Sequence, residues 1–164
     1  MNRKMLAVAM LVLIMVPAVA QAQASANISA SATVATALTA TKQADLAFGT
    51  VYPTFLRTVA TGAVGAARVL FAGSAGAEVN VTFTTLPATL TGPGAPISIS
   101  YSAAHALTAA GVQTTFTPAS GATTLLSGIG ELFVFLGGAI TPAAGQVAGA
   151  YGTTVVVQAA YTGN

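Results

Sequence analysis

Cysteine and tryptophan are absent from the 164-residue chain, histidine occurs once, and charged residues are scarce. Without cysteine the chain can form no disulfide and no thiolate metal site, and it has no attachment point for a cysteine-linked lipid. Charged residues make up 5% of the sequence, far below the roughly 25% of ordinary soluble domains. Because so sparsely charged a surface opposes association only weakly, the composition favours a protein that assembles with other chains.

The N-terminus has the parts of a secretory signal. Arg3 and Lys4 precede an uninterrupted apolar run over residues 5–16, and two small-x-small sites follow it, of which we expect the one ending at Ala24 to be cleaved. The run is too short for a membrane span, which needs about 20 residues. The sequence thus predicts export to the periplasm, the cell surface or the extracellular space, with no transmembrane segment after cleavage.

Cleavage there divides the chain into a signal peptide, residues 1–24, and a single mature domain, residues 25–164. The signal carries two of the five basic residues, which leaves three bases in the mature chain against three acids. These six residues are Lys42, Arg57, Arg68, Asp45, Glu78 and Glu131. Binding to nucleic acid requires basic side chains that neutralise several phosphates at once. A domain without net positive charge cannot do this, so nucleic acid is excluded as a partner.

A two-residue periodicity dominates the mature chain and is typical of half-buried strands. We expect strands in the runs 25–38, 78–83, 97–102, 132–136 and 151–161, with shorter ones at 46–51, 68–71 and 112–116. Glycine and proline clusters predict turns at 73–76, 92–94, 118–121, 137–138 and 142–149. No segment shows a capped helical pattern. Seven or eight short antiparallel strands joined by such turns predict an all-β fold, an immunoglobulin-like two-sheet sandwich.

Residues suited to catalysis are few and scattered. His105 follows a predicted strand without an acidic neighbour in the sequence, so we interpret it as a loop residue. The three acids stand singly, whereas a glycosidase needs two carboxylates within about 10 Å of each other. The glycine-rich stretches match neither a dinucleotide nor a phosphate-binding loop. The sequence therefore predicts a protein that is not an enzyme and that uses no metal or cofactor.

Two stretches carry a family resemblance. They are Asp45-Leu46-Ala47-Phe48-Gly49-Thr50-Val51 and Gly149-Ala150-Tyr151-Gly152-Thr153-Thr154-Val155-Val156-Val157-Gln158-Ala159-Ala160-Tyr161. Together with the Ala/Thr/Ser-rich start of the mature chain and Gly137-Gly138, they resemble the bacterial secreted family catalogued as domain of unknown function 4402, over about residues 25–161. The resemblance implies an immunoglobulin-like sandwich similar to the pilin subunits of chaperone–usher fimbriae. The missing cysteines depart from that pattern, because many pilins contain a disulfide.

The two ends of the mature chain have matching alternation. The first end offers a candidate strand-addition segment, Ile28, Ala30, Ala32 and Val34, and the second offers a candidate acceptor edge, Val155, Val157 and Tyr161. An extended segment can add to an exposed sheet edge by backbone pairing, so one copy could bind the next in this way. The alternative is that residues 25–38 are simply the first strand of the domain itself.

These observations predict a secreted structural or adhesive subunit of the pilin-like kind. We expect it to associate with itself or with other surface subunits, and the pilin resemblance adds a periplasmic chaperone as a partner. The alternative function is a free-standing secreted binding domain, for example for a glycan. Alternation within the predicted strands also places four large side chains in the core: Phe48, Phe83, Val134 and Tyr151.

Overall fold

The computed structural model describes residues 24–163, and the chain divides into a short N-terminal unit and a domain that begins at Val34. The described part of the N-terminal unit, residues 24–33, forms no helix or strand, and its side chains are exposed. The predicted signal lies outside the described residues, apart from its last one, Ala24.

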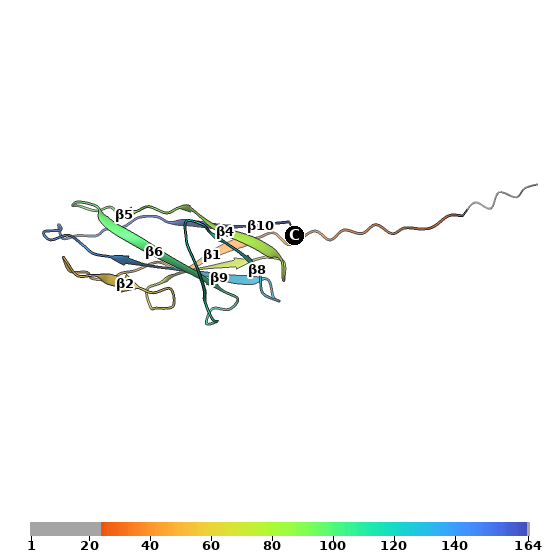
Figure 1. Cartoon of the computed structure of the whole chain (residues 1–164), viewed down its shortest axis with the longest axis horizontal. Coiled ribbons are helices and arrows are strands. Elements are labelled where there is room, and N and C mark those ends of the chain that lie inside the picture. The colour runs from red at the N-terminus through yellow and green to blue at the C-terminus, as the bar shows by residue number, and fades with distance from the viewer. Residues whose placement is uncertain (1–23, 164) are drawn as a thin grey trace, which may run out of the picture. The chain divides into compact units, whose positions relative to one another are not determined.

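The domain contains ten strands and, within residues 34–163, no helix (Figure 1). The strands are β1 (Thr39–Ala44), β2 (Arg57–Val59), β3 (Ala67–Ala72), β4 (Glu78–Thr85), β5 (Thr89–Leu90), β6 (Ile97–Ala106), β7 (Thr114–Phe116), β8 (Ala122–Leu125), β9 (Glu131–Ile140) and β10 (Val156–Tyr161).

The strands form two antiparallel sheets. The larger sheet has the order β1-β3-β9-β6-β5, with β2 paired to β9 and β7 paired to β6, and the smaller has the order β10-β4-β8. Buried side chains between the sheets come from both, with Val79 and Val81 of β4 facing Phe71 of β3 and Leu132 of β9. The predicted all-β fold, a two-sheet sandwich, is confirmed, with ten strands where seven or eight were expected.

Strand β9 is the centre of the larger sheet. It pairs with β6 along one edge and with β3 and β2 along the other, and nearly all its side chains are buried. The turn predicted at Gly137-Gly138 is wrong, because both residues lie inside this strand. A Cβ at Gly137 would collide with the carbonyl oxygen of Val59, and one at Gly138 would lie 2.7 Å from that of Ser100. These glycines therefore permit close approach of neighbouring backbone rather than a change of direction.

Two of the expected strands are absent. No strand occurs over residues 25–38, and the domain begins its first strand only at Thr39. The stretch 46–51 is also a loop: Ala47 donates its N–H to the carbonyl of Gly65 at 2.8 Å, and Gly49 has a φ of 68° that turns the chain. The last predicted strand is shorter than expected, since β10 begins at Val156. Alternation alone could not distinguish these loops from strands, because it does not show where pairing partners lie.

The other predictions of local structure were also right in some places and wrong in others. The turns at 73–76, 92–94, 118–121 and 142–149 are confirmed as loops, and four strands, β1, β2, β5 and β8, were not foreseen. Phe48 and Val134 are buried as expected, whereas Phe83 and Tyr151 are only half-buried. All four residues line the same open space between the sheets.

Candidate functional site: an open groove beside the last strand

An apolar groove of about 680 Å³ opens along one side of the sandwich. One wall is the chain over 42–51, and the other is the chain over 149–157. Its floor is made of inward-facing side chains from both sheets: Val69 of β3, Val134 and Leu136 of β9, and Phe83 of β4. The groove is thus a part of the core that no strand of this domain covers.

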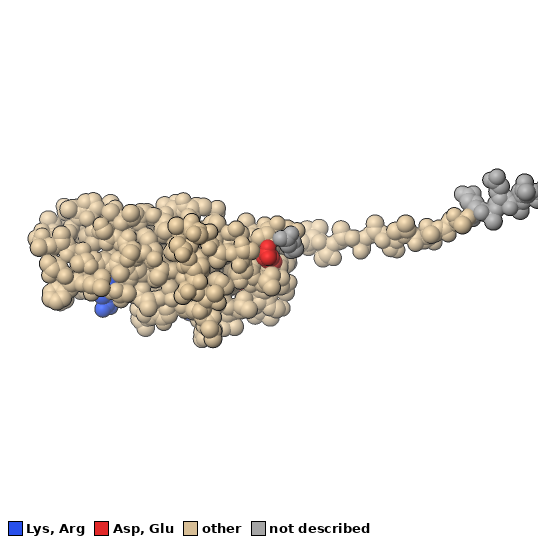
Figure 2. Space-filling model, viewed as in Figure 1, with Lys and Arg blue, Asp and Glu red and all other residues tan. Residues whose placement is uncertain are grey.

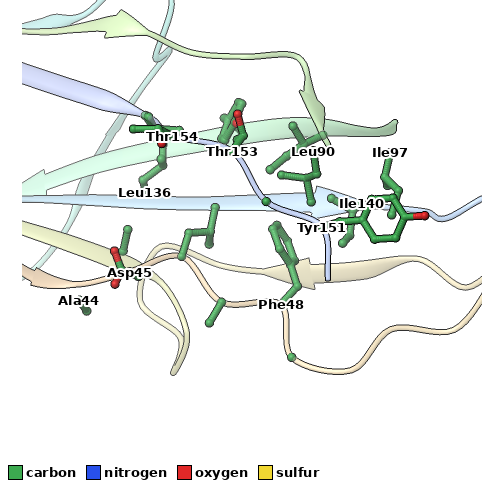
Figure 3. A pocket seen from close by; sticks show the side chains of 18 of the residues that line it. Ala44, Asp45, Phe48, Leu90, Ile97, Leu136, Ile140, Tyr151, Thr153 and Thr154 are labelled. Carbon is green, nitrogen blue, oxygen red and sulfur yellow. The ribbon is translucent and has the colours of Figure 1, made fainter. Parts of the chain in front are cut away.

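Figure 3 shows how the groove is built. Phe48 projects from the lower loop toward β9, where Leu136 and Ile140 lie, and Leu90 and Ile97 lie beyond them. Phe48 is held in place from outside, because Arg57 Nε donates to its carbonyl oxygen at 3.1 Å. The wall formed by the segment after Gly149 includes Thr153, which Figure 3 shows above this apolar floor. An occupant of the groove would therefore meet mainly aliphatic and aromatic surface.

Tyr151 fixes one end of the wall. Its hydroxyl accepts hydrogen bonds from the N–H of Gly94 at 3.1 Å and from Gln146 Nε2 at 2.8 Å. It also donates to the carbonyl of Val147 at 2.8 Å. These bonds join two loops, so the segment that leads into β10 has a fixed course without belonging to a regular strand.

Among the described residues, six polar side chains line the groove: Lys42, Asp45, Tyr101, Tyr151, Thr153 and Thr154. Lys42 and Asp45 form an exposed ion pair at its mouth, with 2.9 Å between Lys42 Nζ and Asp45 Oδ1. Tyr101 lines the groove, and its hydroxyl is buried without a hydrogen-bond partner among the described residues. Burial raises the pKa of this tyrosine. A buried hydroxyl left unpaired destabilises a fold by about 1–3 kcal/mol.

The structure brings two of the three predicted acceptor residues to the groove. Val155 and Val157 are half-buried and line it, whereas the neighbouring Val156 is exposed. Tyr161 lies at the far end of β10, where its hydroxyl donates to the carbonyl of Thr36 and accepts from the N–H of Ser74, each at 2.7 Å. Tyr161 therefore anchors the chain at Thr36 and does not line the groove.

Strand β10 is an edge strand with little protection. It pairs with β4 on one side and, within the described residues, with no strand on the other. Proteins commonly protect such edges with a lysine or by keeping the strand short. The edge strand β1 carries Lys42, and the edge strand β8 has only four residues, but β10 has six residues and no charge. Its free edge is the one best suited to pairing with another chain.

The candidate strand-addition residues are fully available. Ile28, Ala30, Ala32 and Val34 are exposed and belong to no strand, and the side chains of Ile28 and Val34 are each 92% exposed. Apolar side chains that alternate along an extended stretch gain free energy wherever a surface covers one face of it.

The titratable residues do not gather at the groove. His105 is a half-buried residue of β6, and the prediction of a loop there is wrong. Its ring lies 5.9 Å from that of Phe116, and burial lowers its pKa. Glu78 accepts a hydrogen bond from the Thr162 hydroxyl at 2.6 Å, and Glu131 begins β9. Within residues 24–163, no three side chains of His, Asp or Glu are placed to hold a metal ion.

An exposed aromatic turn escaped the sequence reasoning. Tyr52, Phe55 and Leu56 have side chains that are 67–69% exposed, although their types favour burial. Pro53 is the signal that could have revealed the turn, because proline has its φ already set for the second position of a turn.

In the described part of the chain, no helix is long and apolar enough to cross a membrane. Comparison with family models, curated proteins and solved structures finds no match to this chain.

Proposed function

We propose that this protein is an exported, non-enzymatic structural or adhesive subunit, pilin-like in design, whose copies join by strand addition. The open groove beside β10 is the observation that supports this function best. A strand placed there would pair its backbone with the free edge of β10 and insert alternate side chains between the sheets. It would close the sandwich at the point where the core of the domain is uncovered.

The proposed occupant is the N-terminal stretch of a second copy. Its side chains Ile28, Ala30, Ala32 and Val34 share one face, as an inserted strand requires, and they are exposed in the free chain. Burying a fully exposed Ile or Val contributes about 1.5–3 kcal/mol, so Ile28 and Val34 supply most of the apolar gain.

Association through the groove would also remove two costs that a lone subunit carries. Phe83 of the floor and Val157 of the wall would leave water, and the uncharged edge of β10 would gain backbone hydrogen bonds. During export, a periplasmic chaperone would have to cover the same groove, because uncovered apolar edges favour aggregation. The proposed partners are therefore other subunits and a chaperone, not nucleic acid.

The first experiment places a charge on the donor stretch of the chain that starts at Ser25. Ala32→Lys would put an ammonium in the apolar groove at a cost of several kcal/mol. Ser31→Lys is the matched control, since it adds the same charge to the opposite face of the stretch. We expect both variants to melt like the wild type, and only Ala32→Lys to shorten assemblies measured by light scattering.

The second experiment tests the acceptor. Val157→Lys changes a half-buried residue that lines the groove, and Gln158→Lys changes its exposed neighbour in β10. We expect Val157→Lys to bind no donor peptide of residues 25–38, while Gln158→Lys binds it as the wild type does. Thermal melting of the monomers separates lost binding from lost folding. A wild-type chain that stays monomeric at high concentration and binds no donor peptide would leave only the free-standing binding domain.

A further inference from the structure

An exposed apolar turn lies at the end of the sandwich opposite the C-terminal end of β10 (Figure 1). The turn runs from Tyr52 to Phe55, where the N–H of Phe55 donates to the carbonyl of Tyr52 at 3.2 Å. The N–H of Thr54 donates to the carbonyl of Pro142 at 2.8 Å, which ties the turn to the end of β9. None of Tyr52, Phe55 and Leu56 lines the groove, so this surface is separate from the proposed strand-addition site.

The backbone of this turn is strained. Thr54 has a φ of 69°, and it is the one non-glycine residue with positive φ in the described part of the chain. A β-branched residue is rarely found in this region, where glycine is favoured, and strain of this kind often accompanies binding surfaces. The bond to Pro142 holds Thr54 in place, and the turn presents Tyr52 and Phe55 to solvent on either side of it.

Charge around the turn is positive. Arg57 directly follows the turn and is exposed. Glu131 stands at the opposite end of β9 and, because this strand has ten residues, lies about 30 Å from the turn. Glu78 lies at that opposite end too. Its neighbour Ala77 accepts a hydrogen bond from the N–H of Leu126, and the next residue, Ser127, donates its N–H to the carbonyl of Glu131. The remaining acid, Asp45, is paired with Lys42. Figure 2 shows this separation, with basic atoms near one end of the visible face and acidic atoms at the other.

We propose that this turn, with Tyr52, Phe55 and Leu56 at its surface and Arg57 beside it, docks the protein on a lipid surface that carries anionic headgroups. A tyrosine suits the level of the headgroups, phenylalanine and leucine suit the acyl boundary below, and a cation is attracted to the surface charge. A glycan is a poorer partner, because its many hydroxyls need a larger set of polar groups than the hydroxyls of Tyr52 and Thr54 beside Arg57. The docking does not depend on strand addition.

Phe55→Trp provides a direct probe, because the chain contains no tryptophan of its own. The chain starting at Ser25 is used, since the predicted signal would itself bind lipid and all ten strands lie within residues 39–161. The probe is mixed with vesicles of phosphatidylethanolamine and phosphatidylglycerol. We expect its emission to shift to the blue and the protein to sediment with the vesicles, less so with phosphatidylcholine alone or at high salt.

Two further variants identify the residues responsible. The double variant Phe55→Ser, Leu56→Ser should weaken vesicle binding about tenfold, because binding scales with the apolar area inserted. Val64→Ser is the control, since Val64 is a fully exposed apolar residue of another loop, and its binding should equal that of the wild type. The proposal would be overturned if the double variant and Val64→Ser lost vesicle binding equally, or if vesicles did not change the emission of Phe55→Trp. A blue shift produced without vesicles, by raising protein concentration or by adding dextran, would overturn it in favour of a second copy or a sugar.

Discussion

Single residues show where this fold is strained or sensitive to pH. Thr54 and His105 are the clearest cases, because each departs from the conformation or the environment that its side chain prefers. Thr54 occupies a backbone region that suits glycine, and His105 sits half-buried in a strand, where its charged form is disfavoured.

We expect Thr54→Gly to stabilise the domain slightly. Relief of the positive φ is worth about 1–2 kcal/mol, and the greater freedom of glycine in the unfolded chain offsets about 0.5–1 kcal/mol of it. Urea denaturation should therefore give a midpoint equal to that of the wild type or somewhat higher. A loss of more than about 1 kcal/mol would show that the Thr54 side chain, and not only its backbone, holds the turn.

His105 should make stability depend on pH. Burial lowers its pKa in the folded state, so on acidification the unfolded chain takes up a proton first. Stability is therefore undiminished above the unfolded pKa of about 6.5 and falls as the pH drops below it, until the folded state also binds the proton. Urea melts between about pH 7.5 and 5.5 should show this fall in the wild type and a flatter profile in His105→Gln. Equal profiles for the two proteins would contradict the assignment.

At the scale of elements, the two sheets are covered unequally. Phe71 of β3 is 1% exposed between the sheets, whereas Phe83 of β4 lines the open groove and stacks on Phe116 with ring centroids 6.2 Å apart. The same residue type thus performs two tasks. One phenylalanine fills the closed core, and the other forms the floor of an uncovered space.

We expect Phe71→Ala to destabilise the free domain by about 3–5 kcal/mol and Phe83→Ala by about half as much. A large buried side chain leaves a cavity when it is truncated, but truncation in the groove only enlarges a space that is already open. Chemical denaturation of both variants checks the ranking. A reversed order would mean that the groove is closed in solution.

At the scale of the whole molecule, the groove links stability to association. A ligand that binds only the folded state stabilises it by mass action, by about 2.7 kcal/mol at a concentration of one hundred times its Kd. We therefore expect a peptide of residues 25–38 to raise the melting temperature of the chain in a concentration-dependent way. The same peptide with Ala32→Lys is the control and should leave the melting temperature unchanged.

The sequence by itself determined the class of fold and the faces of its longest strands. Alternation placed Val79 and Val81 on the buried face of β4, because a strand buried on one side has apolar residues at every second position. Apolar residues at consecutive positions marked β9 as a central strand, because such a strand is buried on both sides. Glycine and proline clusters located most of the loops for an equally local reason, the backbone conformations they permit.

Only the tertiary structure decided which alternating stretches find a partner. Residues 25–38 and 46–51 alternate like true strands yet belong to no strand of this domain, and Gly137-Gly138 lies inside a strand because neighbouring backbone packs against it. The groove beside β10 and the turn at Thr54 depend on residues far apart in the chain, such as Phe48 with Val157 and Thr54 with Pro142. Pairing and packing between distant segments leave no periodic trace in the sequence, so the site emerges only when the chain is folded.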